Sequence, residues 1–140
     1  MWRDVQSIVG DIERRIDDDL RREWAVPLGS FEVLAALRDL GGRARPLAIA
    51  EHLRIPPSSL TRRLDRLAEE GWIERHRDVD PADHRAIEVE LTPRGRTLWR
   101  EMNLSYRRAV NERFAGRLTD DQVAALIQIA GTLGDRTPPT

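Results

Sequence analysis

The chain has 140 residues, of which 40% are hydrophobic and 34% are charged, and this balance suits one soluble, helix-rich globular domain with a modest core. The sequence contains no cysteine, which excludes disulfides, thiolate nucleophiles, thiol redox sensing and cysteine-ligated zinc. No apolar run approaches the roughly 18 residues that span a bilayer, and the first residues lack the apolar core of a signal peptide. We therefore expect a cytoplasmic protein that does not contact a membrane.

The net charge of −1 conceals an uneven distribution of charge along the chain. Every basic residue is arginine, and the segment from Arg43 to Arg100 has a small positive excess, whereas residues 1–42 are acidic. A basic centre between acidic or neutral ends favours local contact with phosphates, because the local field matters more than the total charge. A solvated charged face gives the same pattern, so charge alone does not decide the function.

Apolar periodicity predicts four helices in the first half of the chain. The first covers residues 4–23, where apolar residues recur at three- and four-residue steps, and residues 25–29 break it. Ser30 is the predicted cap of a second helix, which ends at Gly41-Gly42. A short third helix begins at Pro46 and ends at Leu53, and a fourth runs from Pro57 to Glu70.

Two strands and two further helices are predicted in the second half. Alternation of apolar and polar residues predicts strands at Ile73–Arg77 and Ile87–Leu91, joined as a hairpin with a long tip. Thr92-Pro93 opens a fifth helix that extends to about residue 115. A capping box at Thr119 opens the last helix, and residues 136–140 are expected to form a frayed tail. Two helices joined by a tight turn and followed by a hairpin describe a winged helix-turn-helix.

The fourth helix carries the side chains expected of a DNA-reading helix. Its leucines at positions 60, 64 and 67 define the buried stripe, so hydroxyls and guanidinium groups lie on the other faces. Hydroxyls bond phosphates or base edges, and arginine bonds guanine O6 and N7 in a bidentate fork. The predicted DNA contacts on this helix are Ser58, Ser59, Thr61, Arg62, Arg63 and Arg66. An ordinary surface helix with arginine–carboxylate pairs is the alternative interpretation.

The hairpin supplies a second group of candidate DNA contacts. Arg75 and Arg77 lie on its first strand, and Asp83, His84 and Arg85 lie at its tip. An arginine on a projecting tip can enter a narrow minor groove, where Asp83 would hold the guanidinium of Arg85 in place. The alternative is a solvated loop with a surface ion pair of little energetic value.

Three segments around the hairpin resemble the MarR family of transcription regulators. They are residues 67–75 (LAEEGWIER), residues 80–86 (DPADHRA) and residues 89–95 (VELTPRG), and the similarity covers about residues 30–100. The family shows a Gly-aliphatic-x-Arg entry to the wing, an acid-x-Arg wing tip and a Leu-Thr-x-x-Gly helix start. Trp72 departs from this pattern, since a smaller aliphatic residue is usual there, and its bulk puts the packing of the wing in question.

The resemblance implies a mainly α fold with a small β-hairpin wing, in which a winged-helix DNA-binding lobe (30–92) is flanked by dimerisation helices (1–28 and 93–140). It implies a homodimer that binds a palindromic operator on double-stranded DNA, with Pro57–Glu70 in the major groove and Arg85 in the minor groove. The long apolar stripes of the terminal helices also suggest a dimer interface. We expect a sequence-specific regulator, acting as a repressor without a cofactor.

Members of this family often bind a small aromatic or phenolic ligand that releases the DNA. Trp24, Phe31 and His52 are the predicted ligand-binding residues, although each residue type occurs more often in a core. Ligand binding would shift the population between dimers that can and cannot bind DNA.

Two other classes of function remain to be weighed. His76 and His84 flank an acidic loop with Asp78, Asp80 and Asp83, but positions on a strand and an exposed tip favour a solvated hairpin over a metal site. The sequence also lacks a Gly-rich phosphate loop, so we expect neither a metal nor an enzyme. The stronger alternative is a winged-helix module for protein–protein contact without a DNA target.

Overall fold

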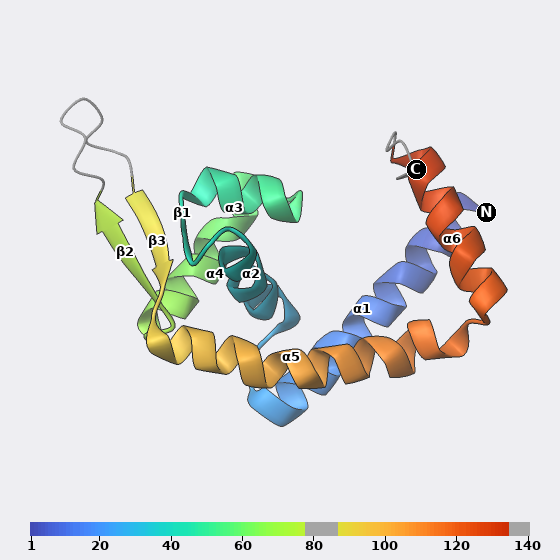
Figure 1. Ribbon diagram of the computed structural model, residues 1–140, viewed down its shortest axis with the longest axis horizontal. Helices are drawn as coiled ribbons and strands as arrows, with labels where there is room; N and C mark the ends of the chain where they lie inside the picture. Colours follow the sequence, from blue (N-terminus) through green and yellow to red (C-terminus); the bar gives the residue numbers. More distant parts are fainter. Residues whose placement is uncertain (78–86, 135–140) are drawn as a thin grey trace.

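The computed structural model describes residues 1–77 and 87–134 (Figure 1). Its elements are α1 (Trp2–Trp24), α2 (Leu28–Asp39), β1 (Arg43–Ala44), α3 (Pro46–Leu53), α4 (Pro57–Glu69), β2 (Ile73–Arg77), β3 (Ile87–Leu91), α5 (Pro93–Arg113), a 3₁₀ turn (Ala115–Arg117) and α6 (Asp120–Leu133). This order confirms the predicted fold class, a mainly helical protein with a small antiparallel wing.

The long helix α5 connects two ends of the molecule. Figure 1 shows α2, α3, α4 and the sheet gathered at the start of α5, whereas α1 and α6 extend toward its other end. Within the part of the chain that the structure describes, no helix is both long and apolar enough to cross a membrane.

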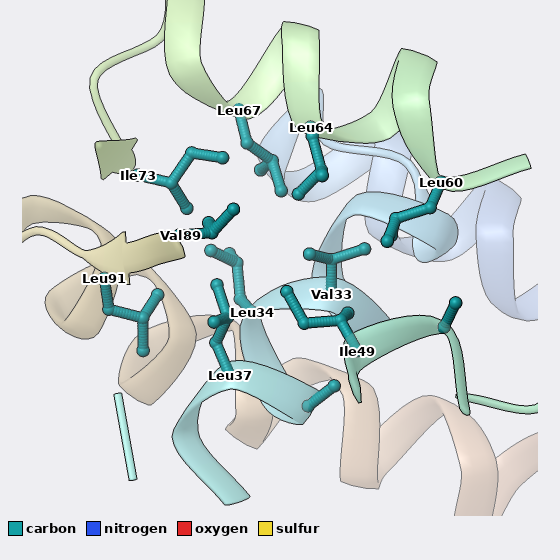
Figure 2. Packing of buried hydrophobic residues seen from close by; sticks show 12 residues of the cluster. Val33, Leu34, Leu37, Ile49, Leu60, Leu64, Leu67, Ile73, Val89 and Leu91 are labelled. Carbon is teal, nitrogen blue, oxygen red and sulfur yellow. The ribbon is translucent and has the colours of Figure 1, made fainter. Parts of the chain in front are cut away.

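The core of the first end joins α2, α3, α4 and the sheet. Figure 2 shows Leu60, Leu64 and Leu67 pointing from α4 toward the apolar side chains of α2 and α3 and toward the strands. The buried residues of this cluster are Val33, Leu34, Ala36, Leu37, Ile49, Ala50, Leu60, Leu64, Leu67, Ile73, Val89 and Leu91. Because these side chains come from α2, α3, α4 and the strands β2 and β3, their packing fixes α4 relative to the wing.

The sheet has one strand more than the sequence pattern predicts. Its described strands lie in the order β1-β3-β2, and both pairings are antiparallel. In β1, Arg43 lies opposite Glu90 and forms ion pairs with the carboxylates of Glu88 and Glu90. Two residues are too few to show alternation, so only the structure reveals this strand.

The start of α2 corrects one prediction. The helix begins at Leu28 with Pro27 in the N-cap position, so Ser30 lies inside the helix and is only 3% exposed. The amide of Leu28 donates instead to Oδ1 of Asp17 on α1, at 2.8 Å. A carboxylate 11 residues earlier therefore satisfies a free amide of the first turn, and Ser30 is not the cap.

A second buried cluster joins α1, α2 and α5. Its members are Ile16, Leu20, Val26, Phe31, Met102 and Ala109. Trp72 packs against both clusters, so its bulk fills the space between the base of the wing and α5. A polar contact also joins α1 to α5. The Arg113 guanidinium donates two hydrogen bonds to Asp19, at 2.9 and 3.0 Å, and holds the pKa of the Asp19 carboxyl below its usual range.

Threonine caps begin both C-terminal helices, as the sequence predicts. Thr92 accepts a hydrogen bond from the amide of Gly95 and donates one to the carbonyl of Gly71. Thr119 and Gln122 form the predicted capping box at α6. The fifth helix ends at Arg113, two residues before its predicted end, and a 3₁₀ turn follows.

Candidate nucleic-acid interface

A tight turn joins α3 to α4. Arg54 ends α3 in the left-handed region at φ 56°, and the amide of Ile55 donates to the carbonyl of Ala50 at 3.1 Å. Pro56 then precedes α4, and Pro57 occupies its first turn, where a missing amide costs no hydrogen bond. The two prolines and this reversal set the angle between the two helices of the helix-turn-helix.

The exposed side of α4 carries four of the predicted DNA contacts. Ser58, Ser59, Thr61 and Arg62 are all exposed, and the buried leucines hold the opposite side of the helix in the core. Three short hydroxyl side chains followed by one long guanidinium therefore line a single accessible surface. Such a surface allows close approach to a nucleic-acid backbone and offers a bidentate donor to a base edge.

Two other predicted contacts on α4 are turned toward the rest of the protein. Arg63 and Arg66 are half-buried. Arg63 forms an ion pair with Glu32 of α2, with Nη1 and Oε2 3.5 Å apart, and Arg66 donates to the carbonyl of Ala25 at 3.0 Å.

The wing strand β2 places its two arginines differently. Arg75 is exposed but donates to Oδ1 of Asp65 on α4 at 2.6 Å, so it ties the wing to that helix. Arg77 is exposed at the end of β2, where the strand leads toward the tip of the hairpin. The predicted contacts at the tip, Asp83, His84 and Arg85, lie outside the described residues.

The structure separates His52 from Trp24 and Phe31, the other two predicted ligand-binding residues. Trp24 donates from Nε1 to the hydroxyl of Ser105 at 2.9 Å, and Phe31 is 2% exposed and packs against the ring of Tyr106. Phe31 belongs to the second buried cluster, and Trp24 packs against that cluster. His52 lies 3.2 Å from the Asp39 carboxylate and borders a cavity of about 680 Å³ between α1, α2 and the helix-turn-helix.

Sequence reasoning missed another cavity, of about 470 Å³, at the base of the wing. Its charged lining residues among those described are Arg38, Arg96 and Arg100, and none is acidic. Arg38 lies over the ring of Trp99 at 4.1 Å, and Nε1 of Trp99 is buried without a hydrogen-bond partner among the described residues. The spacing of Arg96 and Arg100, one helical turn apart, was the only sequence signal for this cationic lining.

No cluster of three or more potential metal ligands occurs within residues 1–77 and 87–134. The acidic loop residues Asp78, Asp80 and Asp83 and the tip residue His84 lie outside that part of the chain. His76 lies near the carboxylates of Glu74 and Glu90, at 3.7 and 3.8 Å.

Comparison with known proteins places this architecture in one family. The sequence profile described as "MarR family" matches residues 26–87. The multiple antibiotic resistance protein MarR of Salmonella typhimurium is 34% identical over 113 residues, which cover 78% of this chain and 76% of that protein. The MarR family regulator Sco3205 of Streptomyces coelicolor, solved in complex with DNA, is similar at a TM-score of 0.85, with 26% identity over 99% of this chain and 86% of that chain.

A third similarity concerns the fold alone. The organohalide-sensing regulator RdhR-CbdbA1625, solved with 2,4-dichlorophenol bound, has a TM-score of 0.84 at 20% identity and covers 97% of this chain and 78% of that chain. The identity and coverage of the Salmonella protein, together with the profile match across the helix-turn-helix, settle the assignment. This chain belongs to the MarR family.

Proposed function

We propose that this protein is a sequence-specific transcriptional regulator that binds a palindromic operator as a homodimer in the cytoplasm and represses transcription. The observation that carries the proposal is the exposed surface of α4, where Ser58, Ser59, Thr61 and Arg62 face solvent on a helix held by a packed winged-helix core. The similarity to Sco3205, a MarR family regulator solved in complex with DNA, supports DNA binding by this protein.

The proposed contacts divide into base reading and backbone positioning. Arg62 reads guanine in the major groove, while the hydroxyls of α4 bond phosphates or base edges. Arg75, Arg77 and the wing-tip residues Asp83, His84 and Arg85 form the second group, in which Arg85 enters the minor groove. No catalytic role is part of the proposal, and the relatives that support it are transcriptional regulators.

The dimer is proposed from the apolar surface of the terminal helices. Exposed apolar side chains lie on α1 and α6, namely Trp2, Val5, Ile8, Val9, Leu126, Ile127, Ile129 and Leu133. We assign residues 1–28 and 93–140 to dimerisation and residues 30–92 to DNA binding. A two-fold axis through the terminal helices would place two copies of α4 about one DNA turn apart.

Fluorescence anisotropy tests DNA binding. The protein is titrated onto the duplex upstream of its own gene and onto a scrambled duplex over a series of salt concentrations. We expect preference for the native duplex and an affinity that falls steeply with salt, because phosphate contacts release counterions. Arg62→Ala should weaken binding to the native duplex without changing the oligomeric state, because Arg62 is exposed on α4 and lies outside the proposed dimerisation helices.

The same titration separates the regulator from its alternative. Absence of binding to either duplex at low salt, with the dimer intact, would contradict DNA binding and favour a winged-helix module for protein contact.

We propose further that a small aromatic or phenolic ligand releases the DNA. The arginine-lined cavity at the base of the wing supports this, because the guanidinium groups of Arg38, Arg96 and Arg100 suit an aromatic anion. The test measures operator affinity against a panel of phenols and aromatic carboxylates, with Arg96→Gln as the variant that should lose the response. Identical operator affinity with every compound would contradict ligand release.

A further inference from the structure

The three arginines of α4 do not share one environment. Arg62 is exposed, whereas Arg63 and Arg66 are half-buried and extend toward the corner between α1 and α2. Arg66 is one helical turn from both Arg62 and Arg63, so helical spacing does not separate them. The contacts with Glu32 and with the carbonyl of Ala25 are what distinguish Arg63 and Arg66 from Arg62. The helical pattern in the sequence places Arg62 and Arg66 away from the leucine stripe and Arg63 on its flank, so it does not reveal that Arg66 is engaged by the protein.

Arg66 acts on the end of α1. Ala25 caps that helix in the left-handed region at φ 56°, and its carbonyl accepts the hydrogen bond from Nη2 of Arg66 at 3.0 Å. Carbonyls at a helix C-terminus lack partners within the helix, and a cation there also interacts favourably with the helix dipole. The guanidinium thus fixes the end of α1 to the last turn of α4.

Arg63 acts on the start of α2. Its guanidinium lies directly over Gly29, where a Cβ atom would be 3.0 Å from Cζ, and its Nη1 lies 3.5 Å from Oε2 of Glu32. This Nη1 is buried and has no hydrogen-bond partner among the described residues, so the nearby carboxylate is what balances its charge. Burial raises the pKa of Glu32, although the Arg63 guanidinium acts in the opposite direction.

We propose that Arg63 and Arg66 are positioning residues, which set the angle of the DNA-reading helix against the α1–α2 corner and do not themselves contact the DNA. The same corner is held by the bond from the amide of Leu28 to Asp17, so α1, α2 and α4 meet through three polar contacts. In this position the guanidinium groups of Arg63 and Arg66 face the α1–α2 corner and not the exposed surface that carries Arg62. This inference rests on the proposed function, because it concerns how the protein presents α4 to DNA.

The slope of log affinity against log salt distinguishes the two roles, since it counts phosphate contacts. Replacing an arginine that contacts phosphate lowers this slope by about 1. Arg63→Gln and Glu32→Gln should each weaken operator binding about 10-fold, the factor that a 1.4 kcal/mol loss of positioning produces, with the wild-type slope retained. Arg62→Gln is the matched control and should lower the slope if it contacts phosphate, or relax base preference if it contacts guanine.

A charge exchange gives the sharper test. Arg63→Glu alone should bind the operator weakly, and the double variant Glu32→Arg/Arg63→Glu should recover most of the lost affinity, because the ion pair is restored in reverse. If Arg63 contacts DNA, the double variant will remain as weak as Arg63→Glu. Failure of the exchange together with a lowered slope for Arg63→Gln would overturn the proposal.

A measurement without DNA separates this proposal from the proposed function. Amide hydrogen exchange over residues 57–69 should be faster in Glu32→Gln than in the wild type, unchanged in Arg62→Gln and restored in the charge exchange. If the wild type binds no duplex, the proposed function fails, and the exchange rates still decide whether Glu32 and Arg63 hold α4. Equal rates in wild type and Glu32→Gln would overturn the positioning role.

Discussion

The two ends of the molecule bury their apolar side chains to different extents. In the winged-helix lobe (residues 30–92), the leucines of α4 and the apolar residues of α2 and the sheet enclose one another. In the helical arm, formed by α1, α5 and α6, the helix α6 has no buried residue and α1 exposes much of its N-terminal half. The lobe therefore completes its core within one chain, whereas the arm presents a surface that a second copy can cover.

Among the predicted changes, a charge inserted into the apolar surface of the arm should have the largest effect, on both the oligomeric state and the operator affinity. Ile127 is 69% exposed on α6, and Ile127→Asp should convert the dimer to a monomer because it places a carboxylate in the proposed apolar interface. Losing the second half-site contact should weaken operator binding about 100-fold or more. Analytical ultracentrifugation measures the oligomeric state, and fluorescence anisotropy measures operator affinity.

The matched control for that change lies in the lobe. Leu47 of α3 is 59% exposed, and Leu47→Asp should leave the dimer intact in ultracentrifugation. A dimer that survives Ile127→Asp would mean that α6 lies outside the interface and that the arm's exposed apolar surface has another occupant.

A cavity in the lobe should have the next largest effect. Leu67 is fully buried on α4, and Leu67→Ala should lower the free energy of unfolding by about 2–5 kcal/mol through lost contacts and the space left behind. Urea denaturation at several protein concentrations measures this loss. Because the lobe's core lies within one chain, the loss should be the same at every concentration, and a loss that grows on dilution would contradict that independence.

The features that could be predicted from the sequence depend on residues close together in the chain. Burial is periodic within one element, so the spacing of Leu60, Leu64 and Leu67 identified the buried side of α4 correctly. Local capping chemistry was also readable, because Thr119 and Gln122 lie three residues apart. Both signals need only neighbouring positions in the chain.

The features that sequence reasoning missed depend on distant partners. Ser30 was expected to cap α2, but the helix begins two residues earlier, where Asp17 of another helix accepts a hydrogen bond from the amide of Leu28. Arg63 has a long flexible stem that reaches either solvent or Glu32, and no local pattern specifies which. The candidate DNA surface was therefore predicted as a face of α4, but not which of its arginines are engaged by the protein itself.

The smallest predicted effect on the free energy of unfolding comes from removing a helix cap, either Thr92 in the lobe or Thr119 in the arm. Thr92 bonds both the amide of Gly95 and the carbonyl of Gly71 at the base of the wing, whereas Thr119 is exposed and bonds the amide of Gln122 alone. Loss of a cap costs about 0.5–2 kcal/mol, and Thr92→Ala should lie near the upper limit because it also leaves a partly buried carbonyl without its donor. Thr119→Ala should lie near the lower limit, since water replaces the lost bond.

Urea denaturation of both cap variants at two protein concentrations checks this order. If α6 packs against a second copy, the cost of Thr119→Ala should grow on dilution, because a helix that no longer forms fully cannot complete the interface, whereas the cost of Thr92→Ala should not change. Equal costs that are both independent of concentration would mean that α6 is stable without a partner. The distinction between a lobe that folds within one chain and an arm completed by another would then not extend to the last helix.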